Sequence, residues 1–291
     1  DAPTLSTQNA SGTEDTAIAL NISSALTDTD GSETLSVTIS GVPDGASLSA
    51  GTNNGDGSWT LTPAQLSGLT ITPPNNSNEN FDLTVTATST ENDGDTATTS
   101  NQITVSVTGD ADAPTLTTQN ASGTEDTAIA LNIASALTDT DGSETLSVTI
   151  SGVPDGASLS AGTNNGDGSW TLTPAQLSGL TITPPNNSNE NFDLTVTATS
   201  TENDGDTATT SNQITVNVTG DADAPTLTTQ NASGTEDSAI ALNISSALTD
   251  TDGSETLSVT ISGVPDGANL SAGTNNGDGS WTLTPAQLSG L

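Results

Sequence analysis

Short runs in which hydrophobic and polar residues alternate follow one another along the whole chain. In the first 111 residues the hydrophobic positions are Ile18, Leu20 and Ile22; Leu35, Val37 and Ile39; Trp59 and Leu61; Leu69 and Ile71; Phe81, Leu83, Val85 and Ala87; and Ile103, Val105 and Val107. Serine and threonine fill most of the alternate sites. Because successive side chains of a strand point to opposite faces, this pattern predicts β-strands with one face turned to a core.

Turn-forming residues separate these runs. Gly, Asn, Asp and Pro are concentrated at Gly41–Gly45, Asn53–Gly57, Pro73–Asn80 and Asn92–Asp95, which predicts turns between the strands. Only the segment Pro63–Gly68, with the sequence PAQLSG, favours a helical turn. Seven or more strands in about 100 residues is typical of an immunoglobulin-like β-sandwich. We therefore expect an all-β fold in which one such unit buries its own core.

The whole pattern repeats with a period of 111 residues. The sequence DAPTL begins at Asp1, Asp112 and Asp223, which divides the chain into repeats 1–111, 112–222 and 223–291, the third of them truncated. The first two repeats differ only at Ser6/Thr117, Ser23/Ala134 and Ser106/Asn217. We expect tandem sandwiches joined into an elongated rod. An array of nearly identical copies favours a function that grows with copy number, such as a spacer, a stalk or a multivalent surface.

The composition narrows the range of partners. The chain has 36 Asp and Glu residues, no Lys, Arg or His, and a formal net charge of −36. Phosphate binding needs basic side chains, so nucleic acid is excluded as a direct ligand, and an anionic membrane surface is unfavourable. No apolar run approaches the roughly 20 residues of a membrane span, so we expect no membrane insertion of this segment. Because no basic side chain balances the carboxylates, we expect metal cations to supply the counter-charge.

Catalysis is not expected from these residues. Nucleophilic triads need a His or Lys base, which the chain lacks, and its carboxylates lie on Gly-rich turns without a sign of an apolar cleft. We therefore predict that the protein is not an enzyme. Trp59, Trp170 and Trp281 suggest either a sugar platform or core residues, and the alternation of Trp59 with Leu61 favours the core.

Three acidic clusters recur in the repeats and are the candidate metal ligands. They are Asp28, Asp30 and Glu33, repeated as Asp139, Asp141 and Glu144 and as Asp250, Asp252 and Glu255; Glu14 and Asp15, repeated as Glu125 and Asp126 and as Glu236 and Asp237; and the linker residues Asp110 and Asp112, repeated as Asp221 and Asp223. Acids two positions apart and followed by Gly can direct several oxygens to one point, as a hard cation requires. The alternative is that these acids form and cap solvated turns.

The order of the strands predicts where these clusters meet. If the first strand runs down the domain and the second returns, Glu14 lies at the far end of its repeat, beside the linker and beside Asp139 of the next repeat. A cation shared there would neutralise acids from two repeats and fix the angle between them. Asp56, Glu91, Asp93 and Asp95 are weaker candidates because acids next to Gly are usually turn residues.

Several segments resemble a known family. GTEDTAIAL, LTDTDGSETLSVTISGVPDGASL, NGDGSWTLTPAQLSGLTITPP and FDLTVTATSTENDGDTATT are similar to the tandem cadherin-like or bacterial immunoglobulin-like repeats of large RTX-type adhesins exported by type I secretion. In cadherin-like repeats an acidic turn, a D-x-D loop and an acidic linker supply calcium ligands, and Glu14, Asp30 and Asp112 occupy matching places. The linker departs from that family, because it reads GDADAP instead of D-x-N-D-N, and Pro63–Gly68 lacks the family's acidic pair.

The resemblance implies extender domains that calcium ions stiffen. Such domains hold a terminal ligand-binding module away from a Gram-negative bacterial cell and serve cell adhesion and biofilm formation. The resemblance therefore also implies an extracellular location on the bacterial cell surface. The expected partners are calcium ions and the neighbouring repeats of the same chain. The alternative is a subunit of a surface layer or extracellular filament that associates laterally or head to tail.

Overall fold

The computed structural model describes residues 1–291, and its regular elements are β-strands and single-turn 3-10 helices. The first repeat contains β1 (Thr4–Thr7), β2 (Ala10–Thr13), β3 (Ile18–Ala19), β4 (Ile22–Ala25), β5 (Glu33–Ser40), β6 (Ser47–Leu48), β7 (Thr52–Asn53), β8 (Ser58–Leu61), η1 (Pro63–Leu66), β9 (Thr70–Thr72), β10 (Phe81–Glu91) and β11 (Thr96–Thr108). The prediction of an all-β fold is confirmed.

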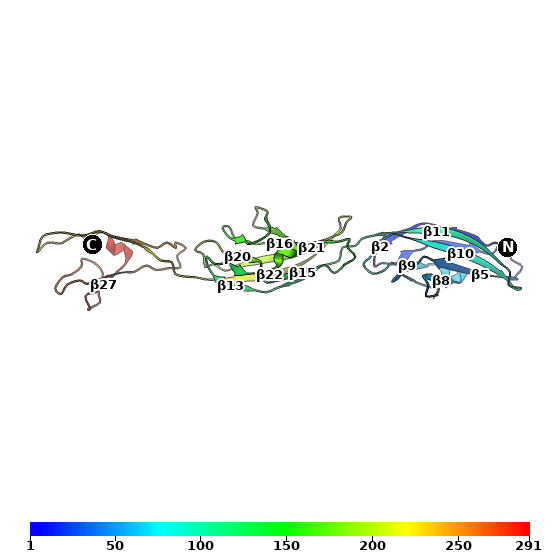
Figure 1. Cartoon of the computed structure of the whole chain (residues 1–291), viewed down its shortest axis with the longest axis horizontal. Helices are drawn as coiled ribbons and strands as arrows, with labels where there is room; N and C mark the ends of the chain where they lie inside the picture. The colour runs from blue at the N-terminus through cyan, green and yellow to red at the C-terminus, as the bar shows by residue number, and fades with distance from the viewer. The chain divides into compact units, whose positions relative to one another are not determined.

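The strands of the first repeat form one large sheet and two small ones. The large sheet has the order β2-β11-β10-β5-β8-β7, and the small sheets are β1-β4 and β3-β9-β6. Long antiparallel strands β5, β10 and β11 are its centre (Figure 1), whereas β2 joins its edge by parallel pairing with β11, in the register Ala10↔Val105 to Thr13↔Thr108. This pairing ends β2 next to the point where β11 leaves the repeat, and it therefore fixes the position of the turn that follows β2.

A single hydrophobic core lies between the sheets of the first repeat. Its fully buried members include Ile39 and Val85 from the large sheet and Ile71 from a small one. Every predicted inward position lies in this core or packs against it, and only Leu35, Trp59 and Phe81 are partly exposed. The alternation of the sequence therefore located the core correctly. The predicted helical turn is also present, as η1.

The second repeat has the same order of elements. They are β12 (Thr115–Thr118), β13 (Ala121–Thr124), β14 (Ile129–Ala130), β15 (Ile133–Ala136), β16 (Thr145–Ser151), β17 (Ser158–Leu159), β18 (Thr163–Asn164), β19 (Trp170–Leu172), η2 (Pro174–Leu177), β20 (Thr181–Thr183), β21 (Phe192–Thr201) and β22 (Thr207–Thr219). Its sheets have the orders β12-β15, β13-β22-β21-β16-β19-β18 and β14-β20-β17, as in the first repeat. The tandem β-sandwich architecture is thus confirmed.

The third repeat has fewer strands. It contains β23 (Thr226–Thr229), β24 (Ile244–Ala247), β25 (Val259–Ser262), β26 (Thr274–Asn275), β27 (Ser280–Leu283) and η3 (Pro285–Leu288), in sheets β23-β24 and β25-β27-β26. Leu227 and Ile240 are exposed. The corresponding residues of the first repeat, Leu5 and Ile18, pack against or lie in its core, and the sequence ends before the positions equivalent to β10 and β11.

The proximity of Cα atoms divides the chain into two compact units. One comprises residues 1–117, 134–149 and 197–211, and the other comprises residues 118–133, 150–196 and 212–291. Each unit contains one complete junction between consecutive repeats. The structure contains no helix with the length and hydropathy of a membrane span.

Candidate metal centre

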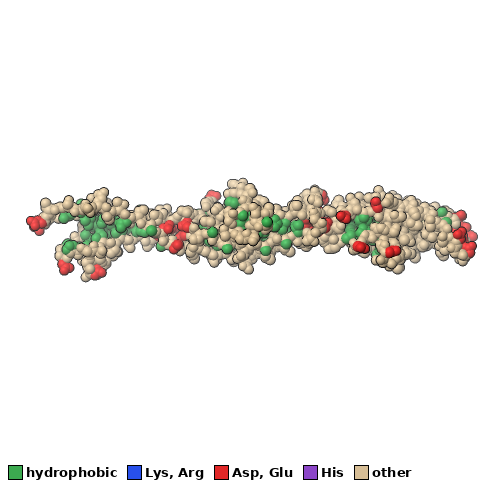
Figure 2. Space-filling view, in the orientation of Figure 1, with side chains coloured by type: hydrophobic (Ala, Val, Ile, Leu, Met, Phe, Trp, Pro, Cys, Tyr) green, Lys and Arg blue, Asp and Glu red, His purple; other side chains and the backbone are tan.

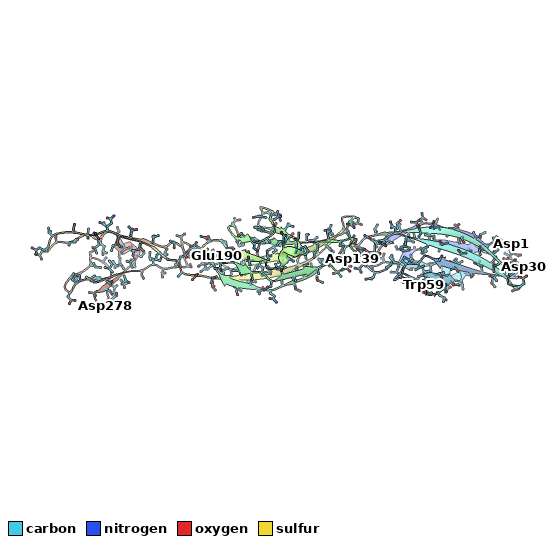
Figure 3. All side chains as sticks on the ribbon, in the orientation of Figure 1. Asp1, Asp30, Trp59, Asp139, Glu190 and Asp278 are labelled. Atoms are coloured by element: carbon cyan, nitrogen blue, oxygen red, sulfur yellow. The ribbon has the colours of Figure 1, made fainter.

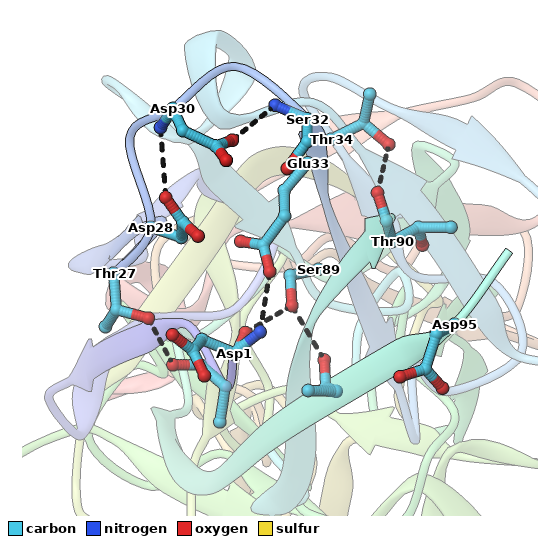
Figure 4. A network of polar contacts seen from close by, with 12 residues as sticks. Asp1, Thr27, Asp28, Asp30, Ser32, Glu33, Thr34, Ser89, Thr90 and Asp95 are labelled. Atoms are coloured by element: carbon cyan, nitrogen blue, oxygen red, sulfur yellow. Dashed lines mark hydrogen bonds and ion pairs between the residues drawn. The ribbon is translucent and has the colours of Figure 1, made fainter. Parts of the chain in front are cut away.

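The Asp28–Glu33 loop shows how the sequence D-T-D-G-S-E arranges its carboxylates (Figure 4). Asp28 Oδ1 accepts a hydrogen bond from the Asp30 amide (3.0 Å), and Asp30 Oδ1 accepts one from the Ser32 amide (2.8 Å). Successive Asp turns of this kind coil the backbone tightly, and Gly31 adopts a positive φ of 91°. The loop lies beside Asp1, at the same end of the first repeat (Figure 3), and the side chain of Glu33 contacts the Asp1 amino group at 2.6 Å.

The same loop in the second repeat lies at the junction with the first. The Asp139 and Asp141 carboxylates accept hydrogen bonds from the amides of Asp141 (2.8 Å) and Ser143 (2.7 Å). Glu144 Oε1 accepts a hydrogen bond from the amide of Asp112 in the linker (2.7 Å). These bonds attach the loop to the chain segment that arrives from the first repeat.

Glu14 approaches this loop from the first repeat. It follows β2, whose pairing with β11 continues with a hydrogen bond from the Glu14 amide to the Thr108 carbonyl (3.0 Å). The next residue, Asp15, has a positive φ of 54°, which reverses the chain direction. Glu14 Oε1 accepts a hydrogen bond from the Asp110 amide (2.8 Å). The turn and the linker together therefore hold this carboxylate at the junction.

A third carboxylate at this site comes from the turn after β21. Glu202 Oε1 accepts a hydrogen bond from Ser143 Oγ (2.9 Å), and its Oε2 atom accepts one from Asn78 Nδ2 of the first repeat (3.4 Å). Gly109 in the linker makes room for it, because a Cβ atom there would lie 2.6 Å from Glu202 Oε2. Residues from both repeats therefore enclose Glu202.

Three buried acids thus meet without any basic side chain. Glu14, Asp139 and Glu202 each place a carboxylate oxygen within 4.8 Å of the others, and their exposed fractions are 1%, 2% and 3%. Burial, followed by the charges of Glu202 and Asp139, raises the pKa of Glu14 from its ordinary value of 4.5 to about 7. Burial likewise raises the pKa of the nearby Glu144. The site therefore disfavours its own negative charge unless a cation or protons compensate it.

Two oxygens at this junction have no hydrogen-bond partner. They are Glu14 Oε2 and Glu144 Oε2, both on buried side chains. Leaving a buried polar atom unpaired costs about 1–3 kcal/mol, and more when the group is charged. A cation would satisfy such oxygens. All the donors are oxygen atoms, which fits the hard cations Ca²⁺ and Mg²⁺ better than metals that prefer nitrogen or sulfur ligands.

The second junction also brings three acids together. Glu125, Asp250 and Asp252 place carboxylate oxygens within 4.8 Å of one another. Glu125 Oε1 accepts a hydrogen bond from the Asp221 amide (2.7 Å), and Glu125 Oε2 is buried without a partner. Hydrogen bonds from Ser254 lower the pKa of Asp252. The sequence ends before the residue equivalent to Glu202, and Asp252 is the third acid here.

The remaining acids that the sequence predicts as ligands lie outside these two groups of three. Asp15 Oδ1 accepts a hydrogen bond from the Asn76 amide (2.9 Å), and Asp112 Oδ2 accepts one from Asn76 Nδ2 (2.7 Å). At the second junction, Asp126 and Asp223 accept the equivalent hydrogen bonds from the amide and the side chain of Asn187. Glu255 accepts a hydrogen bond from the amide of Asp223 (2.6 Å). The side chains of Asp110, Asp141 and Asp221 are exposed, as are Glu236 and Asp237. Asp28, Asp30 and Glu33 form the loop described above, in which Glu33 contacts the Asp1 amino group.

Sequence reasoning ranked one residue of the first site too low. Glu202 is equivalent to Glu91 of the ENDGD turn, and the acids of this Gly-containing turn were weak candidates. Ser143 and Asn78, which hold Glu202, and Asn76, which links Asp15 to Asp112, were not identified as contributors. The available signal was that each lies in a polar turn preserved in both complete repeats, but the same holds for turns that line no site.

Comparisons with known proteins give structural likeness only. No family model matches the chain, and no curated protein matches it. Among solved structures, the chain is similar to mouse cadherin-23 EC22-24, with 18% identity and a TM-score of 0.38, over 75% of this chain and 65% of that one. It is also similar to protocadherin gamma B2 extracellular cadherin domains 3-6 (14%, TM-score 0.35, 81% of this chain and 54% of that one) and to human mucin-like protocadherin EC1-2 (15%, TM-score 0.38, 75% and 99%). At these identities and TM-scores none of them carries an inference about function.

Proposed function

We propose that these repeats are the calcium-stiffened extender region of a large bacterial surface adhesin of the RTX type, exported by type I secretion. In this function the repeats project a ligand-binding end from the cell for attachment and biofilm formation. The observation that carries the proposal is the meeting of Glu14, Asp139 and Glu202, buried acids from two repeats, around a point without a basic side chain. The resemblance of the repeat sequences to such adhesins supports the same function.

The physical role of calcium follows from charge. Without a cation, the buried carboxylates of Glu14, Asp139 and Glu202 repel one another across the junction, which favours its opening. A calcium ion bound by these residues would link the turn after β2 to the loop and the turn of the next repeat. The ion would thereby fix the angle between the repeats. Acidic sites in extracellular modules commonly bind calcium with a Kd of about 10⁻⁴–10⁻³ M, so millimolar calcium is the relevant condition.

The test uses the 291-residue chain in EDTA and in millimolar calcium. We expect small-angle X-ray scattering to show a larger maximum dimension and a narrower range of shapes in calcium, and calorimetry to show calcium binding. Asp139→Asn should reduce both effects. Asp28→Asn in the same 291-residue chain is the matched control, because it changes the equivalent loop of the first repeat, which is not part of the group Glu14, Asp139 and Glu202.

The outcomes separate the extender from other functions. If calcium changed neither the dimensions nor the stability of the chain, or if Asp28→Asn had the same effect as Asp139→Asn, the junction would not be the calcium site and the proposal would fail. Scattering also reports the molecular mass. A calcium-dependent increase in mass would instead favour a self-assembling filament or surface-layer subunit.

A further inference from the structure

Each repeat carries a tryptophan that takes no part in the junction. Trp59 lies in β8, away from Asp1 and Asp30 (Figure 3), and its cross-strand partner in β7 is Asn53. The same pairing joins Trp170 to Asn164 and Trp281 to Asn275. Cross-strand partners lie on the same face of a sheet, so the structure places an indole ring and an amide side by side in every repeat.

In the second repeat this pair lines a surface pocket of about 130 Å³. One wall is the hairpin of β18 and β19, and the other is the loop Val153–Ala157, which a hydrogen bond from the Val153 amide to the Gly168 carbonyl (3.0 Å) joins to the hairpin. The polar and aromatic lining residues are Asp155, Asn164 and Trp170. Gly166 and Gly168, which lie between Asn164 and Trp170 in the sequence, also line the pocket, and both have a positive φ. Their lack of side chains keeps the pocket open.

The polar groups of this pocket are free to bind a ligand. Asn164 Oδ1 accepts the Gly166 amide (2.8 Å), which orients the side chain and leaves the Nδ2 group as a donor. The Asp155 carboxylate is exposed and is an acceptor. Trp170 is half-buried, so that part of its ring packs inward while part lines the pocket. An aromatic ring with one donor and one acceptor can stack on the apolar face of a pyranose and bind two adjacent hydroxyls.

We propose that this pocket binds single hexopyranose units of neutral glycans, and that the equivalent residues of the other repeats form the same site. The net charge of −36 and the red acidic side chains on the surface (Figure 2) repel anionic sugars, which selects neutral ones. Ligand pockets usually have volumes of about 300–1,000 Å³, so a pocket this small binds one ring weakly. Repetition along the chain compensates for weak binding, because linked sites gain avidity.

Tryptophan fluorescence of the 291-residue chain tests this proposal directly. The chain has 3 Trp and no Tyr, so every emitting residue lies at one of the proposed sites. We expect dextran, mannan or galactan, all neutral polysaccharides, to change the emission saturably. Anionic polygalacturonate should not change it. The monomer methyl α-D-glucopyranoside should compete with dextran at a sugar-unit concentration about ten-fold or more higher, because it lacks avidity.

A triple variant separates binding from folding. Asp44→Asn, Asp155→Asn and Asp266→Asn together remove the carboxylate acceptors of all three sites and should weaken polysaccharide binding about ten-fold or more, as expected for losing charge-assisted hydrogen bonds. The control variant Asp93→Asn with Asp204→Asn changes a turn outside the pocket and should bind like the wild type. Equal binding by the triple variant and the wild type would overturn the proposal. So would a lack of response to all three neutral polysaccharides, or an equal response to polygalacturonate.

Discussion

The substitution Glu14→Gln should have opposite effects with and without calcium. Gln keeps the shape of the side chain and an oxygen that can accept the hydrogen bond from the Asp110 amide, but it removes the buried charge. In EDTA above neutral pH the variant should therefore be more stable than the wild type. In calcium the variant lacks one carboxylate ligand and should gain less stability than the wild type does.

The size of the effect follows from the pKa of Glu14, which is raised from 4.5 to about 7. Between these values the unfolded chain loses its proton while the folded chain keeps it, so wild-type stability falls as the pH rises through this range and the loss is complete above pH 7. At about 1.4 kcal/mol per pKa unit, the loss is at most about 3.5 kcal/mol. If the junction opens, Glu14 becomes exposed to solvent, and the loss in the free energy of unfolding is then smaller than this upper limit.

Urea unfolding, followed by circular dichroism and tryptophan fluorescence, measures this difference. In EDTA at pH 8 we expect Glu14→Gln to raise the midpoint of the first transition by up to about 1–3 M, given slopes of about 1–3 kcal/mol per M for small domains. At pH 4.5, where the folded Glu14 keeps its proton, the two midpoints should nearly coincide. The matched control is Glu236→Gln, which changes the same turn in the third repeat, where the side chain is exposed.

Two results would refute this reasoning. If Glu14→Gln were less stable than the wild type in EDTA at pH 8, the buried charge would not be a net cost to the folded state. If Glu236→Gln shifted the midpoint equally, the effect would come from the overall negative charge and not from burial at the junction.

Three further predictions concern the same junction. Gly109→Ala should displace the carboxylate of Glu202 and weaken calcium binding in calorimetry, because a Cβ atom at this position would lie 2.6 Å from the nearest atom. Gly220→Ala is the control and should leave calcium binding unchanged, because there the nearest atom is 3.3 Å away. Calcium affinity at this junction should fall about ten-fold for each pH unit below 7, because a proton on Glu14 competes with the ion; equal affinities at pH 6 and pH 8 would contradict this. Ser143→Ala removes a buried hydrogen bond to a carboxylate and should destabilise the calcium-free chain by about 1–3 kcal/mol in urea unfolding, and an unchanged midpoint would count against it.

The sequence by itself determined the strands, the core and the repeat. Alternation identified the inward positions because a half-buried strand presents every second residue to the core, and Ile39, Val85 and Ile103 are indeed fully buried. The helical turn at Pro63 was equally visible, because Pro and the Thr62–Gln65 capping box are local signals. The strands β1 and β2 were harder to predict, because both are short and consist mainly of Ser, Thr and Gly, so that hydrophobic and polar residues hardly alternate in them.

Strand order and the repeat predicted that Glu14 would lie beside the linker and Asp139 of the next repeat, whereas only the tertiary structure shows that Glu202 joins them. Asp139 and Asp141 lie in the same loop of the second repeat, yet only Asp139 belongs to the buried group with Glu14 and Glu202, whereas Asp141 is exposed. Likewise Glu202 reaches the site because Gly109 leaves space and Ser143 donates a hydrogen bond to its carboxylate. The physical reason is that periodicity and turn chemistry depend on neighbours in the sequence, whereas the burial and mutual repulsion of carboxylates depend on where distant turns come together in space.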